Sequence, residues 1–173
     1  SLSTGVCTVS GTTVTMVSAG NCVIAADQAG NANYAPASQA TQTVAIGKAN
    51  QTITAVATPS TLPYNSTSAL SATGQSGTGA VTYAVATGAS NCSIVGTTLT
   101  GIGVGSCTVT ATIATDTNYN AATSAPITVT VNQATQTITF GAQAPQTFVP
   151  SGTFSISPLA TASSGLTPTY SSL

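Results

Sequence analysis

The chain has 173 residues and a formal net charge of −1, because it contains one lysine, two aspartates and no histidine. Nucleic-acid binding needs several cations that contact phosphates, so a single lysine excludes that class of partner. General acid–base catalysis draws mainly on histidine and carboxylates, and a nucleophilic hydroxyl needs such a base beside it. We therefore expect no enzyme active site, no catalytic residues and no cofactor. No apolar run reaches the roughly 18 residues of a membrane-spanning helix, so we expect no membrane insertion.

Strand patterns run along the whole chain, and no segment shows an apolar stripe with helical spacing. β-branched residues alternate with threonine and serine from the first valines onward, with short breaks at glycine and asparagine. In the central part, strands are predicted at residues 51–56, 66–72, 81–85, 92–95, 98–102, 107–112 and 127–131. Seven or eight short strands in fewer than about 90 residues are typical of a two-sheet antiparallel sandwich of the immunoglobulin type.

The sequence repeats itself at a spacing of 85 residues. The matching positions are Cys7 and Cys92, Cys22 and Cys107, Tyr34 and Tyr119, and residues 51–54 and 136–139. Self-similarity at a fixed period indicates tandem modules. The fold class that we predict is all-β, with tandem immunoglobulin-like antiparallel β-sandwich modules of about 85–88 residues.

The module boundaries do not coincide with the first and last residues of the sequence. Residues 51–135 form one complete module, residues 1–50 match the back half of a module, and residues 136–173 match the front half. The two halves together amount to 88 residues, which is one further module. Either the sequence is one segment of a longer tandem chain, which is the simpler and favoured explanation, or separate subunits complete each other by strand donation. Either way, an isolated chain would have open sandwich edges at both ends.

Four cysteines allow three pairings. The equal spacing of 15 residues in both copies favours the within-repeat disulfides Cys7–Cys22 and Cys92–Cys107. A loop of that length stabilises a fold by about 3 kcal/mol in the chain-entropy model. Zinc sites need closer cysteine pairs or histidines, which leaves free buried thiols as the main alternative. Disulfides persist in oxidising compartments, so we expect an extracellular or cell-surface location.

Two tyrosines, Tyr34 and Tyr119, follow asparagines in the loop before the last strand of each repeat. We predict that they are structural, with a buried ring and a hydroxyl bonded to backbone, as in a tyrosine corner. Stacking against a ligand is the alternative.

Ligand and modification signals are weak. Asp116, with Asn118 and Asn120, resembles part of a calcium cluster, but the equivalent loop has no carboxylate, so we predict a solvated loop and no metal site. N-glycosylation sequons begin at Asn50, Asn65 and Asn91, which would allow a glycan as a partner.

The runs 20–37 and 48–54, with their second copies at 105–109, 118–122 and 136–140, resemble the Ig-like repeats of very large bacterial surface proteins of the adhesin type. The resemblance covers nearly the whole chain. It implies an Ig-like sandwich, export from the cell, and a role as stalk, adhesin or filament. It brings no catalytic residues.

We therefore expect a structural extracellular protein of a bacterium, the repeat unit of a surface fibre, sheath or stalk that assembles head to tail. Its partners would be copies of itself, and its nearly uncharged surface would also permit lateral packing, because like-charge repulsion is weak. The alternative is an adhesin repeat that binds a carbohydrate or a protein surface ligand. Such a site would need exposed aromatic side chains repeated in each module, and the chain has only five tyrosines and three phenylalanines.

Overall fold

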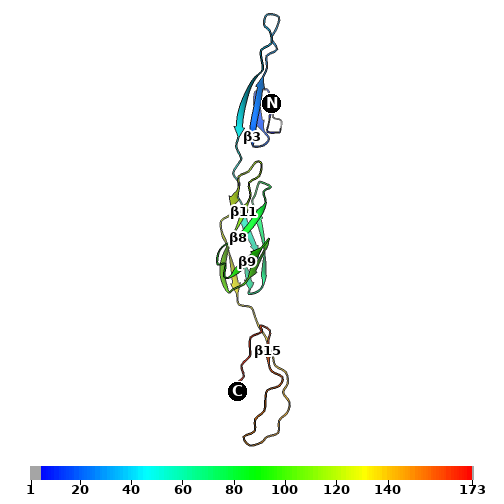
Figure 1. Ribbon diagram of the computed structural model, residues 1–173, viewed down its shortest axis with the longest axis vertical. Helices are drawn as coiled ribbons and strands as arrows, with labels where there is room; N and C mark the ends of the chain where they lie inside the picture. The colour runs from blue at the N-terminus through cyan, green and yellow to red at the C-terminus, as the bar shows by residue number, and fades with distance from the viewer. Residues whose placement is uncertain (1–4, 173) are drawn as a thin grey trace. The chain divides into compact units, whose positions relative to one another are not determined.

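The computed structural model describes residues 5–172, and no helix occurs among them. Figure 1 shows strands joined by turns and extended coil. The predicted all-β class is confirmed. The chain divides into two compact units, one ending at Asn132 and one beginning at Gln133, and each unit is described by itself below.

The central part of the first unit contains a four-stranded antiparallel sheet. Its order is β5-β7-β10-β9. The strands are β5 (Thr54–Thr58), β7 (Thr67–Thr73), β10 (Thr98–Gly101) and β9 (Cys92–Val95). Strands β9 and β10 form a hairpin through the two residues Gly96 and Thr97. Gly96 has a φ of 59°, which suits the first position of a type II′ turn.

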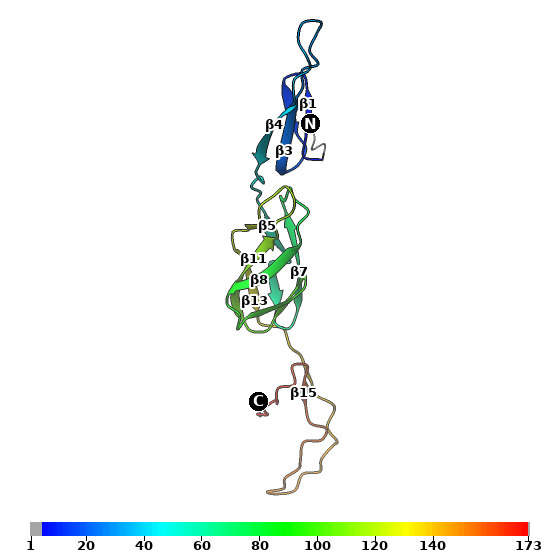
Figure 2. The same cartoon turned by 45° about the horizontal axis from the view of Figure 1, so that its top comes forward.

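A second sheet of five strands is built around β11. The strands are β12 (Ala122–Thr123), β11 (Gly105–Ile113), β13 (Ile127–Asn132), β6 (Thr61–Pro63) and β8 (Val81–Thr87). Strand β11 pairs antiparallel with β8, β12 and β13, whereas β6 pairs parallel with β13. Figure 2 shows β7 and β8 in different layers.

The core lies between these two sheets. Alternate residues of β11, from Cys107 to Ile113, are buried and the residues between them are partly exposed, as expected for a strand with one face inward. Leu70 and Leu99 of the four-stranded sheet pack in one cluster with Val109 and Val129 of the five-stranded sheet. Each fully buried side chain of this kind stabilises the fold by about 1.5–3 kcal/mol. This two-layer arrangement is compatible with a β-sandwich.

The N-terminal part of the first unit consists of two separate two-stranded sheets. One pairs β1 (Cys7–Ser10) with β2 (Thr13–Met16), and the other pairs β3 (Gly20–Ala26) with β4 (Ala40–Ile46). Their registers repeat those of β9–β10 and β11–β13 at the 85-residue spacing. For example, Gly20 faces Ile46, as Gly105 faces Val131.

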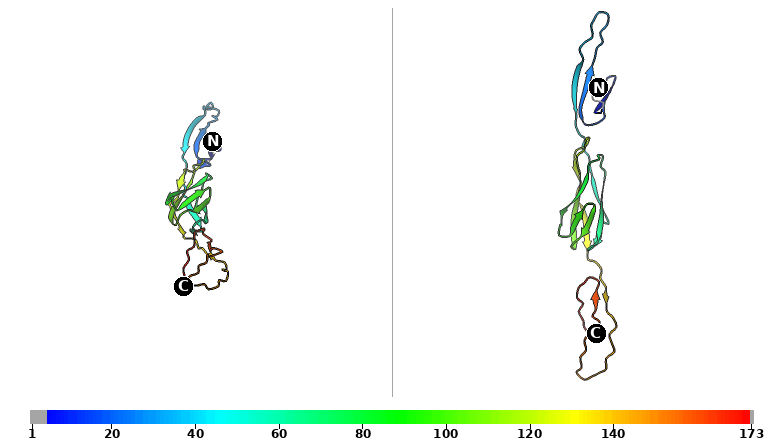
Figure 3. Two further views of the ribbon diagram at one scale, coloured as in Figure 1. Left: turned by 60° about the horizontal axis from the view of Figure 1, so that its bottom comes forward. Right: turned by 45° about the vertical axis from the view of Figure 1, so that its right-hand side comes forward.

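The second unit contains one short antiparallel pair, β14 (Ile138–Thr139) with β15 (Thr161–Ala162). Figure 3 shows most of the remaining segment as extended coil. Thr139, which stands 85 residues after Thr54, faces Thr161, whereas Thr54 faces Thr73 in the β5–β7 pair. The second unit therefore begins with an antiparallel pair like that of β5 and β7, with a longer connection between the two strands.

The division between the units falls close to the expected boundary after residue 135. The assignment of residues 51–135 as a complete module, and of residues 1–50 and 136–173 as halves of modules, stays a prediction. The strands β6 and β12 were not predicted, because one has three residues that end in proline and the other has only two.

Candidate functional site

One disulfide in each repeat joins two of its sheets. Cys92 at the start of β9 is bonded to Cys107 in β11, and Cys7 at the start of β1 is bonded to Cys22 in β3. The Cα–Cα distances are 6.2 and 5.6 Å, and all four cysteines are at most 2% exposed. Within residues 5–172, no cysteine is free. Each bond therefore fastens one layer to the other within its own repeat.

The linker that enters the central part is held against the loop of residues 115–120. The Ala49 N–H donates to the Asn118 carbonyl at 2.8 Å, and the Asn120 N–H donates to the Ala49 carbonyl at 2.9 Å. The Lys48 ammonium donates to Thr115 Oγ1 at 3.0 Å and to the Asp116 carbonyl. Gln51 Nε2 donates to the Asn120 carbonyl at 2.8 Å. We call this contact between residues 48–51 and 115–120 the linker clamp.

Asp116 organises the clamp through its carboxylate. Its Oδ2 accepts the Thr78 N–H at 2.6 Å, and its Oδ1 accepts the N–H groups of Asn118 and Tyr119 at 2.9 and 2.8 Å. These bonds, first from Thr78 and then from Asn118, lower the pKa of Asp116, because they favour the ionised carboxylate. A Cβ on Gly77 would collide with Asp116 Oδ2, so a larger residue there would displace the carboxylate.

The N-terminal repeat contains the same turn with a neutral acceptor. Asn31 Oδ1 accepts the N–H groups of Asn33 and Tyr34 at 2.9 and 3.1 Å. Backbone amides, not phenol hydroxyls, thus anchor both tyrosines in their loops. Tyr34 is 74% exposed, which differs from the buried ring that we expected, and the structural role of the two tyrosines stays a prediction. Tyr119 is half-buried, in the loop that the linker covers.

The carboxylate of Asp116 is turned toward N–H donors, and the Lys48 ammonium lies at the same turn. Such a site opposes a bound cation, because calcium needs oxygen ligands that converge on it. Among residues 5–172 no group of three or more histidine, cysteine, aspartate or glutamate side chains is placed to hold a metal. The predicted solvated loop is therefore better described as a loop that binds the linker.

The asparagines of the three sequons differ in their surroundings. Asn91 Nδ2 donates to the Ser106 carbonyl at 3.0 Å, and Asn120 Nδ2 donates to Asn50 Oδ1 at 2.9 Å. A glycan on Asn91 or Asn50 would disturb these bonds. Asn65 lies exposed in a turn with a φ of 64°, which makes it the best placed of the three for modification.

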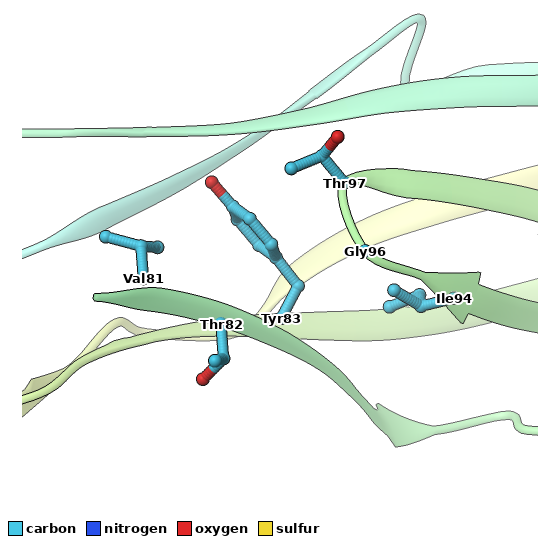
Figure 4. A pocket seen from close by; sticks show the side chains of 6 residues that line it. All are labelled: Val81, Thr82, Tyr83, Ile94, Gly96 and Thr97. Carbon is cyan, nitrogen blue, oxygen red and sulfur yellow. The ribbon is translucent and has the colours of Figure 1, made fainter.

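One shallow pocket lies between β8 and the hairpin of β9 and β10. Figure 4 shows Val81 and Tyr83 pointing to one side of β8 and Thr82 pointing to the other. Tyr83 packs against both buried clusters of the core, and burial raises the pKa of its hydroxyl. Its contacts are those of a core side chain at the rim of the sandwich.

Comparison with protein-family models, with curated proteins and with solved structures gives no match. In residues 5–172, no helix is long and apolar enough to cross a membrane. Two disulfides are typical of extracellular proteins.

Proposed function

We propose that this chain is a structural extracellular protein of a bacterium, the repeat unit of a surface fibre, sheath or stalk that joins head to tail. Its modules would be Ig-like sandwiches that give shape and strength and perform no catalysis. The repeat, the disulfides and the near-absence of charge support this proposal together.

The strand order supports the Ig-like assignment. An immunoglobulin domain has strands A, B, E and D in one sheet and C, F and G in the other. The order β5-β7-β10-β9 corresponds to the first sheet, and β8, β11 and β13 correspond to the second. The disulfide differs, since Cys92–Cys107 joins β9 to β11, whereas antibody domains link strands B and F.

The pairing of β6 with β13 supports a role under tension. Thr61–Pro63 run parallel to Thr130–Asn132, and these strands stand near the entry and the exit of the chain. A force that pulls on the two ends of the module therefore acts along β6 and β13. All the hydrogen bonds between these two strands then bear the force at the same time, in shear. The linker clamp adds bonds at the entry side.

The observation that carries the proposal is the exposure of apolar side chains in the N-terminal repeat. Val14 is 40% exposed, whereas its repeat equivalent Leu99 is fully buried, and Val44 is 50% exposed, whereas Val129 is fully buried. Apolar side chains that one repeat buries and the other exposes favour a contact with another protein surface. Head-to-tail joining would cover it.

The test is the size of particles formed by the purified chain with both disulfides intact. Sedimentation and electron microscopy should show end-to-end particles that lengthen with protein concentration. Met16→Asp should prevent growth, because Met16 stands where Gly101 lies against Val131 in the covered layer. Val95→Asp is the matched control, since Val95 is 82% exposed in the central part. A chain that stays monomeric at every concentration would refute the proposal.

A further inference from the structure

The turn between β6 and β7 contains an asparagine whose side chain does not help to hold the fold together. We propose that Asn65 in this turn is an acceptor for N-linked glycosylation, and that its substrate is an oligosaccharide carried on a lipid diphosphate. The inference concerns a covalent modification and does not depend on head-to-tail joining. It requires that the chain meets a transferase outside the cytoplasm, which the two disulfides favour.

The three sequons of the chain differ in what their asparagines contact. Asn91 Nδ2 donates to the Ser106 carbonyl at 3.0 Å, and Asn50 Oδ1 accepts Asn120 Nδ2 at 2.9 Å. A glycan on either amide would disturb a contact of the folded chain. Within the described part of the chain, the side chain of Asn65 is exposed and makes no hydrogen bond. A sugar on its amide nitrogen therefore breaks no contact.

The backbone of the turn is held on both sides, so the exposure of Asn65 is a property of the fold. Its N–H donates to the Gly101 carbonyl at 2.8 Å, and the Ser66 N–H donates to the Pro63 carbonyl at 3.1 Å. Asn65 has a φ of 64°, which suits the third position of a type II turn. Asparagine tolerates this left-handed conformation. The turn thus uses the backbone of Asn65 and leaves its amide group available.

The third residue of this sequon, Thr67, is available as well. It begins β7 and is exposed, and its hydroxyl makes no hydrogen bond among the described residues. The sequon requires this hydroxyl two positions after the asparagine. A left-handed turn position needs only asparagine or glycine, whereas an acceptor site also needs the hydroxyl. The free amide of Asn65 together with the free hydroxyl of Thr67 therefore favours an acceptor site.

The transfer forms one bond and breaks one bond. The amide nitrogen of Asn65 attacks the anomeric carbon of the first sugar, and a C–N bond forms there. The bond between that carbon and the diphosphate oxygen breaks, and the lipid diphosphate leaves with its electron pair. The amide nitrogen loses one proton to a base of the transferase. The lipid diphosphate oligosaccharide is the only co-reactant, and the step needs no oxidant or reductant.

The position of Asn65 indicates what a glycan would do for this chain. The N–H of the neighbouring Tyr64 donates to the carbonyl of Asn132, the last residue of β13, at 2.7 Å. The glycan would therefore stand at one end of the parallel pair of β6 and β13. With one lysine and two aspartates in the chain, a glycan supplies the solubility that charge gives to other proteins. In the second unit, Ser151 has the left-handed φ of a turn, and serine offers no amide.

The test uses the folded chain with both disulfides intact, an oligosaccharyltransferase that accepts Asn-Xaa-Ser/Thr, and a lipid diphosphate oligosaccharide. The intact mass should rise by the mass of one oligosaccharide, and peptide mapping should place the sugar on Asn65. Asn65→Gly should abolish the rise and keep the fold, because glycine adopts the left-handed conformation freely. Thr67→Val should abolish it too, because valine keeps the β-branched shape and lacks the hydroxyl.

Ser93→Ala is the matched control, because it removes the hydroxyl of the Asn91 sequon. This variant should show the same rise in mass as the unchanged chain, and hydrogen exchange of β11 verifies that each variant is folded. A folded chain that stays unmodified, or that gains its sugar on Asn91 or Asn50, would overturn the inference. The growth of particles is measured separately, so this inference and the proposed head-to-tail function can fail independently.

Discussion

The central part and the N-terminal part of the molecule contain the same hairpins in the same register but differ in burial. Both have a buried disulfide, whereas Val129 is fully buried in the central part and its equivalent Val44 is 50% exposed. Hairpins and disulfides depend on residues close in sequence, so a partial module forms them alone. A core needs two complete layers, and in the central part β5 and β7 complete one sheet while β6 and β8 complete the other. The comparison separates what local sequence determines from what the neighbouring strands add.

The largest expected effect follows from removing each disulfide in turn. In Cys7→Ser/Cys22→Ser, we expect residues 7–46 to lose ordered structure, because among residues 5–46 no strands equivalent to β5, β6 and β7 hold the two hairpins together. In Cys92→Ser/Cys107→Ser, we expect the central part to stay folded with a stability loss of about 3 kcal/mol. Hydrogen exchange of dilute protein gives both results. Equal loss in the two variants would contradict the comparison.

The second effect uses a matched pair of valines. Val129→Ala should lower the free energy of unfolding by about 2 kcal/mol, because it leaves a cavity between two layers. Val44→Ala, at the equivalent but half-exposed position, should cost about 0.5 kcal/mol or less in the monomer. Chemical denaturation measures both. If the dilute chain already lost as much with Val44→Ala, the N-terminal repeat would have a core of its own.

The third effect is a pH dependence confined to the central part. The folded pKa of Asp116 lies below its ordinary value of 3.8, so its stabilising contribution is complete above that value and is lost as pH falls through the folded pKa. Asp116→Asn should remove this dependence, since amides such as Asn31 in the other repeat do not titrate. NMR titration and acid unfolding measure it. An unchanged acid profile in Asp116→Asn would contradict this role.

The smallest effect concerns Lys48. Its ammonium bonds to a hydroxyl and a carbonyl at an exposed site, so Lys48→Gln, which introduces the residue of the equivalent position 133, should change stability by about 0.5 kcal/mol or less. Thermal unfolding measures the change. A loss comparable to that of Val129→Ala would mean that the linker clamp depends on this one side chain.

The sequence predicted the elements whose signals are local. Alternation marked β11 and β13, and glycine at a two-residue turn marked the β9–β10 hairpin. The three-residue strand β6 escaped prediction, because its pairing with β13 joins residues nearly 70 positions apart and its own pattern is too short. The exposure of Tyr34 also escaped, because it depends on which segment covers the loop.

The linker clamp had a signal that was not used. Lys48 and Asp116 are both charged, and both depart from the repeat, where Gln133 and Asn31 stand instead. Two of the three charged residues of the chain, both departures from the period, coincide in one contact. Positions at which the two repeats differ can therefore contact each other in the folded chain.

The disulfide between Cys92 and Cys107 also limits how far the module can extend after it unfolds under force. The two residues are 15 positions apart, and their Cα atoms are 6.2 Å apart. A fully extended segment of that length would span roughly 50 Å. Because the disulfide keeps its ends about 6 Å apart, each closed loop shortens the maximum length of the unfolded chain by roughly 45 Å. A fibre made of such modules would stay short even after individual modules failed, until a reductant opened the loops.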